Sequence, residues 1–449
     1  MHAGAVDSLR SCAVRRLTAL LLLGAALLSM QAVAQSPTVP TIASGATATA
    51  RAVRLRPPVI DIVTVNNSGE LTPANASAAV AAARDAGAAA AIGRSASIGM
   101  TEVRRGGAGV QIAPAGFAYP MGVTALPLEM VASTMGPSIS GVMTADTVVM
   151  GQLTASLRGA AAGDTVTLIA ANGTPTIMTV ALVADDATIG GTELLISPAA
   201  ADRLGVVQSS SVVMWNPSSR GAIDAALSAH GLVNTAVRVR RSWETFDPDS
   251  TIGMAQTKRA LGEFAYRVNG DGSVTLDSTW LSTYITYGAI QGLRLSSGCN
   301  AQVRPALQAA MNEVVAAGLA GTINYADANS AGGCFGPRFN RLTPDSSVGF
   351  LSRHSWGQAI DTNTQGSCQG CAPPDMNCAT VRIFRKHGFA WGGNFLVPDG
   401  MHFEWVGDPR DQFSYPSRFC PNPGSGAAPL TTGDTLRATL FEDAGFTPE

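Results

Sequence analysis

Two short segments near the C-terminal end constrain the fold most, because their polar residues form a reactive set only when the chain brings them together. Residues 352–361 read Ser-Arg-His-Ser-Trp-Gly-Gln-Ala-Ile-Asp, and residues 398–404 read Pro-Asp-Gly-Met-His-Phe-Glu. Their imidazoles and carboxylates lie among apolar, aromatic and glycine residues instead of along a charged face. Two histidines and one aspartate suit Zn²⁺ and leave a fourth position open for water, which distinguishes a catalytic zinc site from a closed structural one. The pattern predicts a zinc hydrolase.

The spacing in the first segment requires a bend. His354 and Asp361 are seven positions apart, so one unbroken strand would direct their side chains to opposite faces. Gly357 lies between them and can adopt the backbone angles of a bend. We therefore expect the chain to turn near Gly357 and to present both side chains to one site.

The second segment has a similar arrangement. Asp399 and His402 are three positions apart, and Gly400 lies between them. On a strand that begins at His402, the side chains of His402 and Glu404 share one face. Glu404 is therefore a candidate for the carboxylate that orients a metal ligand from behind.

These segments resemble the M15 metallopeptidases, the group of D-alanyl-D-alanine carboxypeptidases and L-alanyl-D-glutamate endopeptidases that cut bacterial cell-wall peptides. The resemblance extends to Gly-Cys-Phe-Gly-Pro-Arg-Phe-Asn-Arg at 333–341 and to Ile-Phe-Arg-Lys-His-Gly-Phe-Ala-Trp-Gly-Gly-Asn-Phe at 383–395. It implies an α+β fold for residues 250–420, a zinc peptidase domain of the hedgehog and DD-peptidase type with a central antiparallel sheet.

The resemblance also implies roles for individual residues. It assigns one Zn²⁺ per chain to three ligands: His354, Asp361 and His402. Asp399 would be the catalytic carboxylate, which accepts the proton of the attacking water and passes it to the leaving amine. Arg338 would stabilise the oxyanion, although Arg341 remains an alternative. Zinc itself lowers the pKa of bound water to about 7 and polarises the scissile carbonyl.

Two other histidines are expected to have structural roles. His230 and His387 each precede a glycine at an expected helix end. A histidine at that position interacts favourably with the last carbonyl groups of the helix. We expect both to be cap residues and not metal ligands.

The cysteines indicate an oxidising compartment. Of the seven cysteines, Cys12 lies near the N-terminus and the others lie between 299 and 420. These are Cys299, Cys334, Cys368, Cys371, Cys378 and Cys420. An even number in an exported chain favours three disulfides, whose pairing the sequence does not decide. The alternative is a second zinc site built from Cys368, Cys371 and Cys378.

The N-terminus is typical of a secretory signal. Arginines precede the apolar run at 17–30, and small residues at 32–34 complete a cleavage pattern. We expect residues 1–34 to be a signal peptide, and the mature protein to be periplasmic, cell-wall-associated or secreted, with no membrane span. The formal net charge of −2 gives no electrostatic reason to expect nucleic acid as a partner.

The remaining chain divides by composition. We expect a linker at 35–57, an Ala/Gly-rich segment at 58–119 with one helix at 75–92, and a tail at 421–449. Residues 120–245 show a separate α+β pattern, with a hairpin across Asn172-Gly173 and a helix at 198–204. No catalytic cluster is evident there, and Glu193 is expected at the surface. We predict that this module is a binding or positioning domain, and that its partner is a protein of the cell envelope.

Two functions remain open. The first is a zinc peptidase acting on peptidoglycan stem peptides. The second is a non-catalytic, zinc-containing binding protein of the cell envelope, since a fold alone does not establish an activity. Within the first, the sequence does not decide between removal of a terminal D-alanine and internal cleavage. The depth of the substrate pocket decides between these two cleavage sites, and we expect the loop at 366–378 to control that depth.

Overall fold

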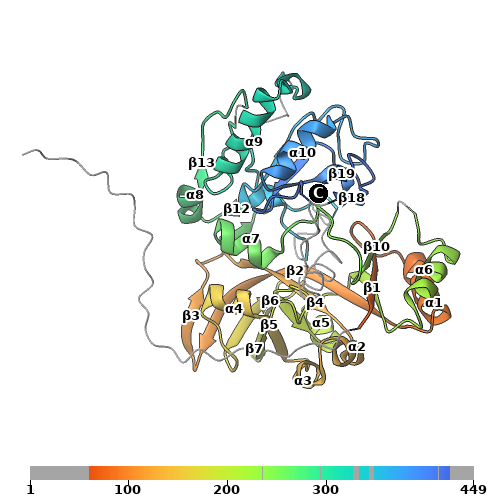
Figure 1. The fold of residues 1–449 in the computed structure, drawn as a ribbon. Helices are drawn as coiled ribbons and strands as arrows, with labels where there is room; N and C mark the ends of the chain where they lie inside the picture. The colour runs from red at the N-terminus through yellow and green to blue at the C-terminus, as the bar shows by residue number, and fades with distance from the viewer. Residues whose placement is uncertain are drawn as a thin grey trace, which may run out of the picture. The chain divides into compact units, whose positions relative to one another are not determined.

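The first half of the described chain is built around a ten-stranded sheet (Figure 1). The computed structural model describes residues 60–234, 236–293, 295–326, 333–342, 348–412 and 414–424. The expected signal peptide, the linker and nearly all of the tail therefore lie outside the described residues. The strands are β1 Ile62–Asn66, β2 Ala89–Arg105, β3 Ala108–Ile112, β4 Tyr119–Ala125, β5 Thr147–Gly151, β6 Thr165–Ile169, β7 Pro175–Ala184, β8 Leu194–Ile196, β9 Ser209–Trp215 and β10 Arg238–Arg241.

Part of this sheet closes into a barrel. The 17-residue strand β2 pairs with β4 through residues 94–100 and with β6 through residues 99–104. The strands β2, β4, β8, β5, β7 and β6 therefore form a closed ring. Alternate residues of β6 point inward, and Val166 and Leu168 join the buried core of the barrel. The sheet takes strands from both the Ala/Gly-rich segment and the region expected to be a separate α+β module, and the closure was not predicted.

The rest of the sheet is covered by helices. Strands β9, β1 and β10 continue it beyond β2, and helices α1 and α6 pack together on them (Figure 1). The helices of this half are α1 Pro73–Asp85, α2 Leu128–Thr134, α3 Pro137–Ser140, α4 Gln152–Arg158, α5 Pro198–Leu204 and α6 Arg220–Ala229. The predicted β6–β7 hairpin and the helix at 198–204 are confirmed.

The helix predicted at 75–92 is correct only in its first part. It begins after the cap residue Thr72, not at Asn75, and it ends at Asp85. Gly87 then takes a φ of 68°, and the alanines from Ala89 onward pair with β9 as the start of β2. Alanine favours helix by propensity, but pairing in the sheet overrides that preference here.

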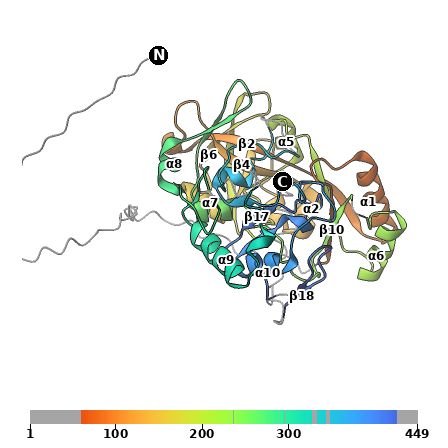
Figure 2. The ribbon, with the colours of Figure 1, turned by 90° about the horizontal axis from the view of Figure 1, so that it is seen from above.

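The C-terminal region contains a three-stranded antiparallel sheet in the order β15 Ala359–Asp361, β17 His402–Trp405, β16 Phe389–Trp391. Phe403 of β17 packs on Phe384 of helix α10, with ring centroids 4.2 Å apart. Helix α10 therefore covers the face of β17 that does not carry His402 and Glu404. Helix α9 lies beside α10 (Figures 1 and 2).

The remaining elements of this region are short. Its helices are α7 Met254–Leu261, α8 Ser278–Tyr284, α9 Arg304–Ala316 and α10 Cys378–Lys386, with 3-10 turns η1 Ala320–Thr322, η2 Arg353–Trp356 and η3 Gly392–Asn394. Three small hairpins complete it: β11 Tyr266–Val268 with β12 Val274–Leu276, β13 Ile285–Thr286 with β14 Cys299–Asn300, and β18 Ser414–Tyr415 with β19 Asn422–Pro423. None of the helices in the described ranges combines the length and the apolar character needed to cross a bilayer.

Three disulfides join the six cysteines between 299 and 420. The pairs are Cys299–Cys334, Cys368–Cys371 and Cys378–Cys420. The prediction of three bridges is confirmed. The alternative of a second zinc site is wrong, because Cys378 is bonded to Cys420, away from the Cys368–Cys371 pair.

A buried cluster of four charges joins the barrel to helix α7. Lys258 Nζ lies 2.7 and 2.9 Å from the two carboxylate oxygens of Glu193, and 3.3 Å from Glu263 Oε1. Arg158 donates to Glu263 as well. Glu193 is only 2% exposed, so its predicted surface position is wrong. Two cations and two carboxylates balance within this cluster, which removes the cost of leaving a buried charge unpaired.

Candidate metal centre and active site

The bend expected at Gly357 places His354 at the site. His354 lies in η2, whose cap residue Ser352 accepts a hydrogen bond from the His354 backbone N–H at 3.3 Å. Gly357 then adopts a φ of 62°, and a Cβ at this position would lie 2.7 Å from the backbone nitrogen of Asn300. Only glycine satisfies both requirements. The chain reverses there and enters β15, which ends at Asp361.

Asp361 and His402 are cross-strand neighbours. They are directly opposed in the antiparallel pairing of β15 with β17, and Asp361 Oδ1 lies 3.2 Å from His402 Nδ1. Directly opposed residues share one face of a sheet. The register of the two strands thus brings together residues that are 41 positions apart in the chain.

A backbone contact sets the orientation of the His354 ring. Its Nδ1 lies 3.1 Å from the carbonyl oxygen of Cys334, and a carbonyl only accepts, so Nδ1 carries a hydrogen. Nε2 lies on the other side of the ring, 3.3 Å from Asp361 Oδ1. A backbone acceptor of this kind is the usual means of orienting a metal-binding histidine.

A buried carboxylate faces the His402 ring from the side opposite Asp361. The Nε2 of His402 lies 3.7 Å from Oε2 of Glu404, which is completely buried. Glu404 is held in turn by Arg353 Nε at 3.4 Å and by Gln358 Nε2 at 3.4 Å. Arg353 is itself anchored by bonds to Thr257 Oγ1 at 2.9 Å and to the Ile252 carbonyl at 2.8 Å.

Sequence reasoning gave no role to Arg353 or Gln358. The sequence did offer one sign of this pairing: an arginine directly precedes His354 in a segment that was expected to be buried. A buried charge in such a segment needs an opposite charge nearby. Glu404 was already expected on the inner face of β17, so the two residues could have been paired.

The arrangement of the three predicted ligands fits zinc. One atom from each of His354, Asp361 and His402 lies within 4.8 Å of the others. With bonds of about 2.0–2.1 Å, two ligands of a tetrahedral zinc lie roughly 3.3 Å apart. The separations of 3.3 Å from His354 and 3.2 Å from His402 to the shared Asp361 oxygen match that value. Two imidazole nitrogens and one carboxylate oxygen are also the donor types that zinc prefers.

The electrostatic environment favours a cation at this point. Burial lowers the pKa of His402, but Asp361, Glu404 and Asp399 act against it, and the pKa lies well above the usual range. Burial likewise raises the pKa of the Asp361 carboxyl, but His354 and His402 outweigh it, and that pKa lies well below its ordinary value. The surplus of negative charge that favours imidazolium would equally favour a metal cation.

Asp399 lies in the turn that leads into β17. Its carboxylate is buried, its backbone N–H donates to the Gly392 carbonyl at 2.8 Å, and its own carbonyl accepts from His402 at 3.1 Å. A Cβ at Gly400 would overlap the ring of Pro374, so glycine is required for the loop to approach this turn. The predicted base is therefore held in a closely packed turn, three positions before a predicted ligand.

The loop at 366–378 braces this turn. Met401 donates its backbone N–H to the Ser367 carbonyl at 2.8 Å, and Gly370 donates to the Pro398 carbonyl at 2.6 Å. A β-bridge between Gln369 and Asp399 lies between these two bonds. The loop thus contacts the backbone on both sides of Asp399.

The structure distinguishes the two candidate arginines. Arg338 is half-buried, and its backbone N–H donates to Ser355 Oγ at 3.2 Å while its carbonyl accepts from Ser352 at 2.9 Å. These bonds attach the Arg338 segment to the turn that carries His354. Arg341 is exposed. The Arg338 guanidinium lies 3.4 Å from the Gly336 carbonyl oxygen, and the choice between Arg338 and Arg341 stays a prediction.

The two remaining histidines of the described chain have the structural roles that were predicted. His387 is the cap residue of α10, and its Nε2 lies 2.8 Å from Glu313 Oε2. His230 is the cap residue of α6, and its Nε2 lies 2.8 Å from Asp85 Oδ2. Neither belongs to the His354–Asp361–His402 cluster.

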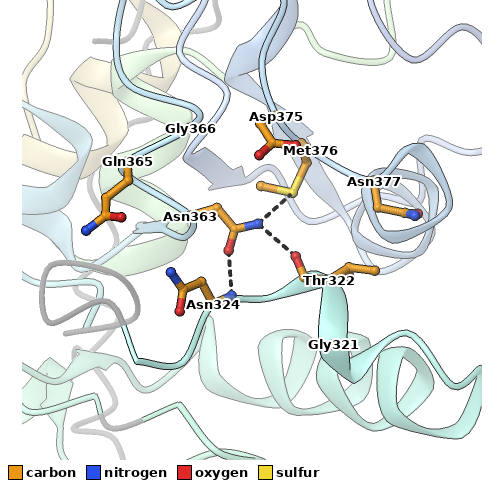
Figure 3. Close-up of a pocket in the computed structure, with 9 residues that line it drawn as sticks. All are labelled: Gly321, Thr322, Asn324, Asn363, Gln365, Gly366, Asp375, Met376 and Asn377. Atoms are coloured by element: carbon orange, nitrogen blue, oxygen red, sulfur yellow. Dashed lines mark hydrogen bonds between the residues drawn. The ribbon is translucent and has the colours of Figure 1, made fainter.

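A polar cavity of about 500 Å³ begins two residues beyond Asp361 (Figure 3). Asn363 lies at its centre, and the loop at 366–378 forms one wall. The described lining residues are Gly321, Thr322, Asn324, Asn363, Gln365, Gly366, Asp375, Met376 and Asn377.

The C-terminal region is similar to a family of peptidases. Residues 346–405 match a peptidase M15 family model described as D-alanyl-D-alanine carboxypeptidase. The resemblance drawn from the sequence is confirmed for this segment, which contains the three clustered residues, Asp399 and Glu404. Arg338 lies before the matched residues. No curated protein matches the chain.

Proposed function

We propose that this protein is an exported zinc-dependent peptidase that hydrolyses peptide bonds in peptidoglycan stem peptides. The observation that carries the proposal is the convergence of His354, Asp361 and His402 at zinc-ligand separations inside the segment that matches the M15 family. That family supports peptidoglycan-derived peptides as the substrate class. We further propose that residues 250–420 form the zinc peptidase domain.

The residues around the cluster have distinct roles in this proposal. When bound, Zn²⁺ acts as a Lewis acid that makes water a nucleophile near neutral pH. Asp399, buried beside His402, accepts the proton of the attacking water and transfers it to the leaving amine as the C–N bond breaks. Arg338 stabilises the negative charge that develops on the carbonyl oxygen. Glu404 keeps the His402 ring oriented.

Two observations support export. Disulfides persist mainly in oxidising compartments, and six cysteines of this chain are paired. The N-terminal segment has the pattern of a secretory signal. We infer that the barrel holds the peptidase region in position through the charge cluster around Lys258, and that any envelope partner binds to the barrel.

The test uses the full-length oxidised protein and a defined stem pentapeptide. We expect turnover that a chelator abolishes and added Zn²⁺ restores, with the products identified by mass spectrometry. Release of a single D-alanine would assign a carboxypeptidase, and internal fragments would assign an endopeptidase. Zinc binding without turnover of any stem peptide would instead support the non-catalytic binding protein.

A further inference from the structure

The cavity beside β15 has the size of a ligand site and an unusual lining. At about 500 Å³ it falls within the range of small-molecule and side-chain pockets. Asp375 is the only charged residue among the described lining residues, and most of the others are amides or a hydroxyl. No cationic side chain of the described lining would repel a positively charged group. The lining therefore suits a polar, cationic ligand group better than an anion.

Several lining side chains form hydrogen bonds that hold the walls of the cavity in place. The Asn363 amide nitrogen donates to the Thr322 carbonyl at 2.7 Å, and its oxygen accepts the Asn324 N–H at 2.7 Å (Figure 3). Asn377 accepts two backbone N–H groups at the start of α10. These bonds fix the floor and one wall, so these amides serve mainly to hold the cavity open.

Two lining residues, Asp375 and Gln365, are exposed, and their side chains take no part in the bonds described above. The Asp375 carboxylate and the Gln365 amide form no hydrogen bond or ion pair with any residue in the described part of the chain. Asp375 packs against the Gly366 backbone, where a Cβ would lie 2.9 Å from its Oδ2. An ionised carboxylate only accepts hydrogen bonds, and an amide oxygen offers a further acceptor. An alkylammonium group has three donors and no acceptor, so it complements this pair.

We propose that this cavity is a substrate subsite for the side-chain ammonium of a diamino acid in the peptide, with Asp375 as its charge partner. The inference rests on the proposed peptidase function, because it places the subsite next to the scissile bond. Asn363 follows Asp361 by two residues, and two residues span at most about 7 Å. A side chain that enters the cavity would therefore belong to a residue near the bond being cut.

The subsite and the catalytic turn share one loop. The loop at 366–378 contributes Gly366, Asp375, Met376 and Asn377 to the cavity and also bonds to the backbone on both sides of Asp399. A ligand amine bound at Asp375 would therefore be held by the same loop that positions the predicted base. We expect recognition of the amine to affect turnover as well as binding.

The kinetic test compares two pentapeptides that are identical except at one lysine, whose ε-amine is free in one and acetylated in the other. We expect the wild-type protein to prefer the free amine by up to about five-fold in kcat/KM, the range of an exposed ion pair. Asp375→Asn should lower kcat/KM for the free-amine peptide more than for the acetylated peptide, which removes most of that preference. Glu70→Gln, which removes an exposed carboxylate elsewhere, should keep it. Equal and measurable wild-type rates on the two peptides, or a parallel loss on both in Asp375→Asn, would overturn the proposal.

A binding measurement separates this proposal from the peptidase proposal. Calorimetry on Asp399→Asn, with and without Asp375→Asn, reports the affinity for both peptides while turnover is slowed. Tighter binding of the free-amine peptide that depends on Asp375 would sustain the subsite even if the wild-type protein hydrolysed neither peptide, in which case only the peptidase proposal would fail. Equal binding of both peptides would refute the subsite whatever the turnover.

Discussion

Asp361 and His402 face each other directly across two antiparallel strands, with Oδ1 and Nδ1 3.2 Å apart. Their relationship is fixed by backbone pairing, since Thr362 donates to the Met401 carbonyl at 2.8 Å and continues the ladder. A pair held in this way needs little reorganisation to bind a metal. The site is therefore preorganised by the sheet, and His354 completes it from the adjoining turn.

Loss of either histidine should remove the metal. We expect His354→Ala and His402→Ala to retain little zinc after dialysis, because two protein ligands rarely hold zinc tightly. Elemental analysis of the oxidised protein measures this directly. His387→Ala provides the matched control, since His387 contacts Glu313 and lies outside the cluster. Full zinc content in both site variants would show that the ligands lie elsewhere.

Removal of Asp399 should separate metal binding from chemistry. Asp399→Ala should keep its zinc and lose roughly 10²- to 10⁴-fold in kcat, the usual contribution of a positioned general base. Paired measurements of zinc content and stem-peptide turnover test this. Near-normal kcat would require another base, and Glu404 would then be the next residue to replace.

The support behind His402 should affect zinc affinity more than folding. Glu404→Gln removes the charge that faces His402 Nε2 while keeping the volume of the side chain. Replacement of such a supporting carboxylate typically costs about 10- to 100-fold in metal affinity. Competition against a chromogenic chelator gives the zinc Kd. An unchanged Kd would mean that the 3.7 Å contact between His402 and Glu404 has no orienting role.

The buried charge cluster should make a large contribution to stability. Lys258→Met removes one of the two cations, Lys258 and Arg158, that face the buried carboxylates of Glu193 and Glu263, at a cost of about 3–5 kcal/mol in the free energy of unfolding. Denaturant titration measures the change. The double variant Lys258→Met with Glu193→Gln should recover part of the loss, because it removes one uncompensated charge. An equal or larger loss in the double variant would contradict the proposed charge balance.

The same cluster should weaken in acid. Burial raises the pKa of the Glu263 carboxyl, but Arg158 and Lys258 outweigh it, so the pKa in the folded protein is lower than the ordinary value. A carboxyl with a lowered folded-state pKa adds stability above its unfolded pKa of about 4.3, and that stability is lost as the pH falls through the folded value. We therefore expect the unfolding free energy to fall below about pH 4.3, and to fall less steeply in Glu263→Gln. Identical pH slopes would contradict this assignment.

Much of the candidate site was predictable because its determinants are local. The glycine between His354 and Asp361 predicted the bend. The alternation of side-chain direction along the strand from His402 to Glu404 predicted the supporting carboxylate. Both depend on backbone geometry within a few residues. The partners of Glu404 were missed because Arg353 and Gln358 reach it across the strand pairing, and the one local signal was the arginine directly before His354.

The barrel was less predictable for the same physical reason. Its hairpin and its capped helix at 198–204 follow from turn and cap residues, and these were found. Closure depends on β2 pairing with β4 and β6 at once, which is a property of register between distant segments. Glu193 appeared to be a surface residue because its cation, Lys258, follows it by 65 positions.

The loop at 366–378 has an implication for how this protein could diverge. One side of the loop shapes the cavity, and the other side bonds to the backbone around Asp399. A substitution or insertion that adapts the cavity to a new peptide would also shift the turn that carries the predicted base. In the proposed peptidase, a change in substrate range would therefore also change the catalytic rate. Descendants with altered preferences should carry compensating changes at Pro374 or Gly400, where the loop and the turn touch.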